Sequence, residues 1–141
     1  MTRKSILLVC LSFFFLMSFS QEYISKEDVS YIPKGETDEY RKERCKLDIY
    51  YPSDKKDFVT VVWFHGGGLE GGEKGIPAEL KNKGIAVVAP NYRLSTKAKN
   101  PAYIEDAAEA VAGYLRISLH SAVIPPGISM SQAIRQEDIW H

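Results

Sequence analysis

The residues from Phe58 to Gly68 form an apolar, β-branched run that ends in a histidine and three glycines. A strand that delivers backbone N–H groups to a glycine-walled turn is how acyl-transfer enzymes stabilise the negative charge of a tetrahedral intermediate. Glycine suits this task because it has no Cβ to obstruct the approach of an oxyanion to the backbone. The segment therefore predicts an anion-stabilising loop at His65, Gly66, Gly67 and Gly68.

The same chemistry needs a nucleophile, normally a serine in a Gly-x-Ser-x-Gly turn, and the sequence contains no such turn. The nearest candidate is Ser121, in Leu119-His120-Ser121-Ala122-Val123, where leucine and valine occupy positions that the tight turn needs to be small. We therefore predict that the chain has no intact set of catalytic residues. Ser121 is the weak candidate for the nucleophile, and the alternative is that Ser121 is an exposed serine of the tail. His120 and His141 could act as bases, but only their residue type suggests it. Because the chain has no clear nucleophile for a base to activate, we expect both histidines to lie on the surface.

The glycines also fit a second kind of site, one that binds a dinucleotide. Gly66, Gly68 and Gly71 satisfy the G-x-G-x-x-G fingerprint of dinucleotide-binding folds. That site needs a helix that begins within the glycine loop, so that its N-terminal N–H groups face the pyrophosphate. Here two further glycines and Pro77 delay the helix, and Asn91 stands where the ribose-binding acid belongs. A dinucleotide-binding module is the alternative function.

Hydrophobic patterns around the loop predict an α/β fold. Residues 45–51 alternate between polar and apolar types, which is typical of a half-buried strand. Residues 58–64 and 85–90 are nearly continuous apolar runs, typical of parallel strands covered on both faces. A predicted helix over residues 76–83, closed by Gly84, joins these two strands into a βαβ unit with helices on both sheet faces.

A longer helix is predicted from Asn100, as the capping residue, and Pro101, at the first helical position. Its apolar residues recur at helical spacing and form a small-residue face that we expect to pack on the sheet: Ile104, Ala107, Ala108, Val111, Ala112 and Leu115. Beyond Arg116 no period is apparent, so we expect residues 117–141 to be an irregular, loosely packed tail.

The N-terminus carries a predicted secretory signal over residues 1–20. Arg3 and Lys4 precede an apolar stretch, and Ser18-Phe19-Ser20 offers small residues to a signal peptidase. The alternative, a membrane-spanning anchor, needs about 20 apolar residues, and this stretch is shorter. We expect a secreted or periplasmic protein without a stable membrane anchor after cleavage. Residues 21–44 are polar, with a predicted edge strand at 29–32, and precede the main α/β portion at 45–116.

The amino-acid composition limits the classes of partner and cofactor that we expect for this chain. The formal net charge is 0 and no basic cluster forms a stripe, which argues against nucleic acid. Removal of the signal would remove Cys10 and leave Cys45 as the one remaining cysteine, so we expect no intrachain disulfide. We also expect Cys45 to be a buried thiol. No cofactor or metal is expected.

The segment His65-Gly66-Gly67-Gly68 resembles the HGGG oxyanion-hole motif of α/β-hydrolase esterases and lipases. Residues 46–52, 88–94 and 103–108 resemble the early strands and the first long helix of the secreted carboxylesterase-like branch. The resemblance covers about residues 40–112. It implies a partial α/β-hydrolase fold, with a mostly parallel sheet flanked by helices and incomplete at its C-terminal side.

The resemblance also implies roles. The N–H groups of Gly66, Gly67 and Gly68 would form the oxyanion hole, His65 would brace the loop, and a small-molecule, glycan or lipid ester would be the substrate. In the family the nucleophile lies on a further strand, yet only 29 residues follow Ala112. We therefore expect a truncated or internally deleted, inactive form of low stability. The strand that ends at His65 would then have one unpaired edge, which favours aggregation.

Overall fold

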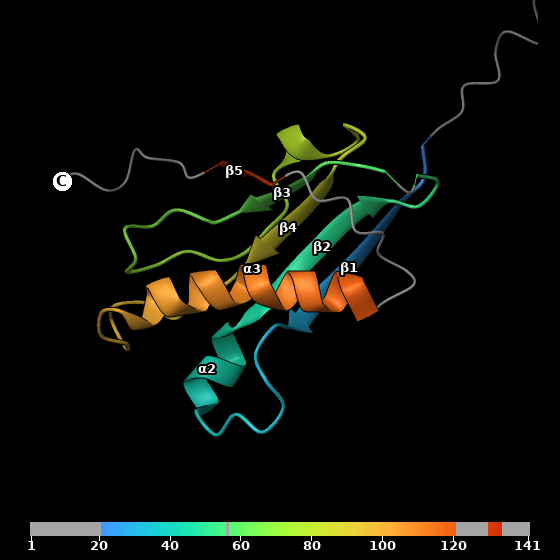
Figure 1. Cartoon of the computed structure of the whole chain (residues 1–141). Helices are drawn as coiled ribbons and strands as arrows, with labels where there is room; N and C mark the ends of the chain where they lie inside the picture. Colours follow the sequence, from blue (N-terminus) through green and yellow to red (C-terminus); the bar gives the residue numbers. More distant parts are fainter. Residues whose placement is uncertain (1–20, 56, 121–129, 134–141) are drawn as a thin grey trace, which may run out of the picture.

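The computed structural model describes residues 21–55, 57–120 and 130–133 (Figure 1). The expected signal over residues 1–20, Ser121 and His141 lie outside this part. The elements, in chain order, are β1 (Tyr23–Ser30), α2 (Glu39–Arg44), β2 (Lys46–Pro52), β3 (Thr60–Trp63), the 3₁₀ turn η1 (Ala78–Leu80), β4 (Ala86–Pro90), α3 (Ala102–His120) and β5 (Met130–Ala133).

The strands form one sheet in the order β1-β2-β4-β3-β5. β2 pairs antiparallel with both β1 and β4, whereas β3 pairs parallel with β4 and with β5. The α/β class is thus confirmed, and the sheet is mixed. Every residue of β4 is buried, as its apolar run predicts, whereas β3 alternates between buried and half-buried positions.

The expectation of an unpaired edge on β3 is wrong, and so is that of an irregular tail for residues 117–120 and 130–133, the part of the tail that the structure describes. β5 runs parallel to β3, with Thr60 opposite Met130 and Trp63 opposite Ala133. α3 also continues past Arg116 as far as His120. The sequence did not reveal β5 because its four residues are half polar and lack a period, while pairing with an existing strand supplies the backbone hydrogen bonds.

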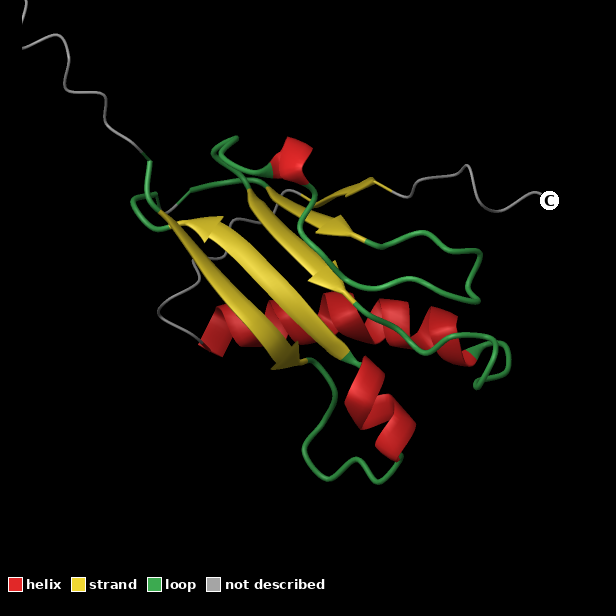
Figure 2. Cartoon of the chain, turned by 180° about the vertical axis from the view of Figure 1, so that it is seen from behind, coloured by secondary structure: helices red, strands yellow, loops and turns green. Residues whose placement is uncertain are grey.

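Different structures cover the two faces of the sheet (Figures 1 and 2). α3 packs on one face, where the Tyr114 hydroxyl lies 3.2 Å from the Thr60 hydroxyl. The connection from β3 to β4 covers the other face. There Lys74 pairs with Asp48 at 2.5 Å and Tyr50 donates to Asn82 at 2.7 Å. The helix predicted over residues 76–83 is therefore wrong in type and length.

That connection contains only the three-residue turn η1 because its sequence resists a regular helix. Pro77 precedes the turn, and Asn82 and Gly84 have positive φ values of 59° and 72°. These left-handed residues end helical geometry soon after it begins. The βαβ connection is thus a loop with one turn, and α3 is the only helix on a sheet face in the described part of the chain.

The face of α3 that packs on the sheet matches its hydropathy only in part, since Val111 and Leu115 pack against the core as predicted and Ile104 does not. The buried residues are Asp106, Ala110, Gly113, Tyr114 and Ser118, whereas Ile104 is 59% exposed and Ala108 is also exposed. Its helical turns begin at the Pro101 carbonyl, which accepts hydrogen bonds from Ile104 and Glu105. The rest of the face was not predicted because a buried aspartate and a glycine, which lie at its centre, count as outward-facing in a hydropathy pattern.

The N-terminal segment holds more structure than expected. β1 begins at Tyr23 and ends at Ser30, so the edge strand lies mostly before the predicted residues 29–32. α2 was missed, although Asp38 caps it by accepting hydrogen bonds from the N–H groups of Tyr40 and Arg41. Cys45 is fully buried as expected, and burial raises the pKa of its thiol to about 11.

Gly113 allows α3 to approach the chain at Tyr31. A Cβ at residue 113 would lie 2.6 Å from the Tyr31 carbonyl oxygen. Gly→Ala in a helix normally stabilises by about 1 kcal/mol. Here we predict that Gly113→Ala lowers the free energy of unfolding by about 1–3 kcal/mol because the helix must move outward. Thermal and urea unfolding followed by circular dichroism measure this. Gly75→Ala, with nothing within 4 Å of the added methyl, is the matched control, and equal stability of both variants would contradict the tight packing.

Candidate functional site

The glycine loop predicted from the sequence begins two residues after the carboxyl end of β3. β4 and β5 flank β3 and run in the same direction, so their carboxyl ends point toward the same edge of the sheet. The loop after β3 and the N-terminus of α3 lie at this end, and the C-terminus of α3, which ends at His120, lies at the other (Figure 1). Ligands of open α/β sheets bind at the carboxyl end of the strands.

The loop folds back on itself at two glycines that no other residue could replace without strain. Gly67 has a φ of 118°, and its carbonyl accepts hydrogen bonds from Glu70 N–H and Gly71 N–H at 3.0 and 3.1 Å. Gly72 has a φ of 100°, and a Cβ there would lie 2.3 Å from both the Gly66 carbonyl and the His65 Nδ1. The loop's tip is held by a hydrogen bond from Ser95 N–H to the Leu69 carbonyl.

Gly66, Gly67 and Gly68 are exposed. Within residues 21–55, 57–120 and 130–133, no acceptor takes a hydrogen bond from their N–H groups. A buried N–H group without a partner is costly, whereas these exposed groups remain available to water or to an anion. Within the described residues, the structure therefore presents three successive free donors just beyond the parallel strand β3.

His65 is tied to the loop and to the segment after β4. Its ring stacks on Tyr92 with 4.5 Å between centroids, and the Tyr92 hydroxyl donates to the His65 carbonyl at 2.8 Å. Its Nδ1 lies 2.8 Å from the Gly66 carbonyl, an acceptor, so Nδ1 carries the proton. Burial, reinforced by the charge of Arg44, lowers the pKa of His65. The ring is therefore neutral at pH 7.

Arg44 is a loop contact that the sequence did not reveal. Its side chain is 8% exposed and donates to the Tyr92 carbonyl and to the Gly72 carbonyl, each at 3.1 Å, while a third contact is an ion pair with Glu73. One guanidinium thus fixes the loop to the segment after β4. Arginine suits this position because its donors form a rigid fork. No sequence signal identified it, since Arg44 lies in a charged stretch that reads as solvated.

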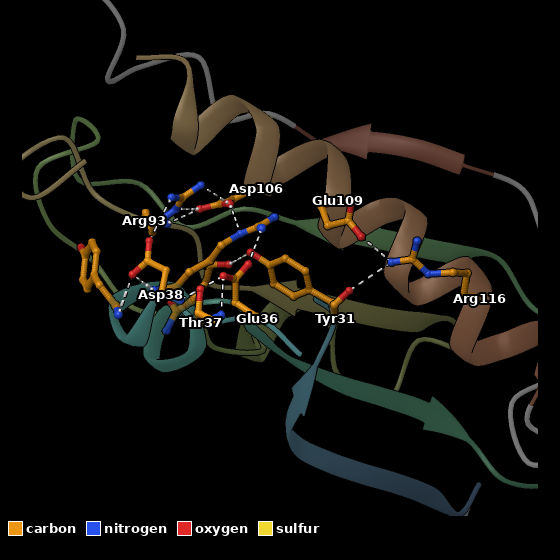
Figure 3. A network of polar contacts seen from close by, with 11 residues as sticks. Tyr31, Glu36, Thr37, Asp38, Arg93, Asp106, Glu109 and Arg116 are labelled. Atoms are coloured by element: carbon orange, nitrogen blue, oxygen red, sulfur yellow. Dashed lines mark hydrogen bonds and ion pairs between the residues drawn. The ribbon is translucent and has the colours of Figure 1, made fainter. Parts of the chain in front are cut away.

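A second buried charge holds the same segment from the other side (Figure 3). Asp106 is fully buried on α3, and its carboxylate accepts two hydrogen bonds from the Arg93 side chain, at 2.7 and 2.9 Å. Arg41 of α2 approaches the carboxylate with its Nε at 3.3 Å, and its Nη1 pairs with Glu36 at 2.6 Å. Burial alone would raise the pKa of Asp106, but the hydrogen bonds from Arg93 lower it overall.

The candidate nucleophile is not brought to this loop by any described residue. His120, which precedes Ser121 in sequence, is exposed, and its Nδ1 lies 2.8 Å from the Arg116 carbonyl of its own helix. The fingerprint Gly66, Gly68 and Gly71 is present, but no α-helix begins between Gly66 and η1. The geometry that a pyrophosphate needs is thus missing from the described loop.

The described residues were searched for clusters that could hold a metal ion and for helices that could cross a membrane. Within them, no three histidine, cysteine, aspartate or glutamate side chains gather closely enough to hold a metal ion. None of the helices in these ranges combines the length and the apolar character needed to cross a membrane.

Solved structures with a similar fold are esterases. The chain matches esterase B from Lactobacillus rhamnosis with a TM-score of 0.58 and 17% identity, over 86% of this chain and 38% of that one. It matches a truncated carbohydrate esterase from gut microbiota with a TM-score of 0.57 and 21% identity, over 82% and 40%. A "Bifunctional GH43-CE" from Bacteroides eggerthii gives a TM-score of 0.58 and 26% identity, over 77% and 15%. The chain thus spans less than half the length of these structures.

These similarities define the fold as a partial α/β-hydrolase fold of the esterase type. The model of the BD-FAE family, an α/β-hydrolase-related domain, matches residues 47–119, slightly more than half of the chain. The protein belongs to the BD-FAE family. No curated protein matches the chain significantly.

A substitution at Gly72 tests whether its close contact with Gly66 and His65 fixes the positions of the free N–H groups in the loop. We predict that Gly72→Ala shifts the backbone amide resonances of Gly66, Gly67 and Gly68, because the added methyl collides with the Gly66 carbonyl and the His65 ring. Gly71→Ala is the matched control, since nothing lies within 4 Å of its methyl. Two-dimensional amide NMR spectra measure both variants. Unchanged resonances in Gly72→Ala, or equal shifts in both variants, would refute the described loop geometry.

Asp106 predicts a pH dependence of stability. Because the folded-state pKa lies below the unfolded value, Asp106 stabilises fully above about pH 5 and loses this contribution as the pH falls through about 4 toward the folded pKa. We predict that Asp106→Asn costs about 1.5–3 kcal/mol at pH 7, since the half-buried Arg93 loses its fully buried charge partner and keeps only the 3.5 Å contact with Asp38.

The difference in the free energy of unfolding between wild type and Asp106→Asn should become smaller below about pH 4. Urea titrations at several pH values measure it. The exposed control Asp57→Asn should change stability by less than about 0.5 kcal/mol throughout. A difference that is small at pH 7, or that grows on acidification, would contradict the role of this ion pair.

Proposed function

We propose that the protein is an esterase-like member of its family in which Gly66, Gly67 and Gly68 form the oxyanion hole for a carboxylic ester. The observation that carries the proposal is the row of three exposed, unpaired N–H groups beyond β3. Donors of this kind stabilise the oxyanion of a tetrahedral intermediate, and one donor is typically worth about 3–4 kcal/mol in the transition state.

His65 acts in this proposal as a brace of the loop and takes no part in proton transfer. Its Nδ1 proton is engaged with the Gly66 carbonyl, and its ring is stacked on Tyr92. Its lowered pKa and its contact with its own loop both favour a fixed, neutral ring. The other ring nitrogen, Nε2, is an acceptor, but it is buried and has no hydrogen-bond partner within the described residues, whereas a general base must reach the proton of its nucleophile.

We further propose that these 141 residues bind but do not turn over an ester. In the sheet, β5 lies beside β3, the position where the family carries its nucleophile. The sequence after β5, residues 134–141, contains no serine, threonine or cysteine. Ser121 lacks the small neighbours of a nucleophile turn, and its sequence neighbour His120 lies at the end of α3 remote from the loop (Figure 1).

The substrate class we propose is a small acyl ester, including acyl groups on glycans. A carbohydrate esterase among the structural neighbours supports this class. Export through residues 1–20, giving a secreted or periplasmic protein, also remains our proposal, resting on the charged start and apolar stretch of that segment.

The test combines turnover, labelling and binding on the purified protein. We predict no hydrolysis of p-nitrophenyl acetate above buffer and no specific labelling by a fluorophosphonate probe. Methylphosphonate, a tetrahedral anion, should shift the amide resonances of Gly66, Gly67 and Gly68 in wild type and in Gly71→Ala, but not in Gly72→Ala.

Specific fluorophosphonate labelling that disappears in Ser121→Ala would identify Ser121 as a nucleophile and overturn the inactive assignment. Failure of the anion to perturb the three glycine amides would overturn the oxyanion hole. A rise in melting temperature with NAD or ATP would favour the dinucleotide alternative instead.

A further inference from the structure

Each of the three free N–H groups in the glycine loop shares a peptide plane with the carbonyl of the residue before it. The peptide bonds of the loop are trans, so this carbonyl and the N–H group point in opposite directions. The Gly66 N–H therefore points away from whatever holds the His65 carbonyl. The same relation joins the Gly67 N–H to the Gly66 carbonyl, and the Gly68 N–H to the Gly67 carbonyl. A carbonyl that is fixed by a hydrogen bond thus sets the direction of a free donor.

All three of these carbonyls are held, each by a different donor. The Tyr92 hydroxyl donates to the His65 carbonyl at 2.8 Å, and the His65 Nδ1 donates to the Gly66 carbonyl at 2.8 Å. The Gly67 carbonyl accepts hydrogen bonds from two N–H groups later in the loop, at 3.0 and 3.1 Å. The last two carbonyls are thus held from within the loop. The direction of the Gly66 N–H depends instead on a side chain from the segment after β4.

The surroundings of Tyr92 keep its hydroxyl in one place. Tyr92 is 5% exposed, and its ring stacks on the His65 ring at 4.5 Å and contacts the Phe64 ring at 6.3 Å between centroids. Its carbonyl accepts a hydrogen bond from Arg44 at 3.1 Å. A buried hydroxyl costs free energy unless it is hydrogen-bonded, and a phenylalanine would fill the same space without that cost. The hydrogen bond to the His65 carbonyl is therefore a contribution that tyrosine makes here and phenylalanine cannot.

We propose that Tyr92 is a positioning residue of the oxyanion hole, whose hydroxyl fixes the His65 carbonyl and so aims the Gly66 N–H at the bound anion. This role rests on the oxyanion hole proposed above, and Tyr92 acts through Gly66 without contacting the anion. Hydrogen-bonded groups in series also polarise one another. The hydroxyl on the His65 carbonyl therefore makes the Gly66 N–H a stronger donor as well as a fixed one.

The direction of the Gly66 N–H can be measured without any anion. Residual dipolar couplings of amide N–H groups in an aligned NMR sample depend on the direction of each N–H bond. In wild type, the couplings of Gly66, Gly67 and Gly68 should fit the directions in this structure. Tyr92→Phe should change the coupling of Gly66 and leave the other two within experimental error, because their preceding carbonyls keep their donors.

A titration with methylphosphonate, followed by the same amide resonances, measures what this direction contributes to binding. Tyr92→Phe should bind the anion about two- to tenfold more weakly than wild type, as expected for one misaligned hydrogen bond, and the anion-induced shift should fall most at Gly66. Tyr50→Phe is the matched control, because it removes a tyrosine hydroxyl that donates at 2.7 Å to Asn82, shortly before β4. It should leave the couplings and the affinity unchanged, and circular dichroism checks that each variant is folded.

A wild-type Gly66 coupling that does not fit the structure, or one that stays unchanged in Tyr92→Phe, would overturn the role of Tyr92. Equal changes at all three glycines would overturn it too, because they would show that the hydroxyl supports the loop as a whole. Wild-type affinity in a Tyr92→Phe protein with an altered Gly66 coupling would refute the contribution to anion binding. If the couplings behave as expected but methylphosphonate shifts none of the three amides in wild type, the oxyanion hole fails while the control of the Gly66 N–H by Tyr92 stands.

Discussion

The ion pair between Arg93 and Asp106 is the contact on which the arrangement of the candidate site depends. It fastens α3, on one face of the sheet, to the segment that follows β4. Tyr92, the neighbour of Arg93, stacks on His65 and donates to its carbonyl, and Arg44 then joins the Tyr92 carbonyl to Gly72. The position of the glycine loop is therefore set by a chain of polar contacts that begins at one buried carboxylate.

Local sequence rules predicted the parts of this molecule whose signal lies in neighbouring residues. The alternation over residues 45–51 and the apolar run over 85–90 correspond to β2 and β4 within a residue or two at each end. The glycine loop was also predicted, because strand, histidine and glycines are consecutive. The α/β-hydrolase resemblance is confirmed by the family match and by the fold.

The remaining features depend on contacts between distant residues. Arg44 and Glu73 are 29 positions apart, and Arg93 and Asp106 are 13 apart, so no periodicity relates them. Hydropathy also predicted only part of the face of α3 that packs on the sheet, since the other buried residues include a paired aspartate and a glycine. β5 was missed because its stability comes from β3, a strand far away in the sequence.

The loop after β3 is ordered while three of its N–H groups stay free, and an oxyanion hole requires both properties. Amide hydrogen exchange, combined with heteronuclear relaxation, measures both in one sample. We expect Gly66, Gly67 and Gly68 to exchange at rates close to those of an unstructured peptide, Glu70 and Gly71 to be protected, and all five to be as rigid as β4. Protection of the three glycine amides, or relaxation typical of a freely moving loop, would contradict this description of the site.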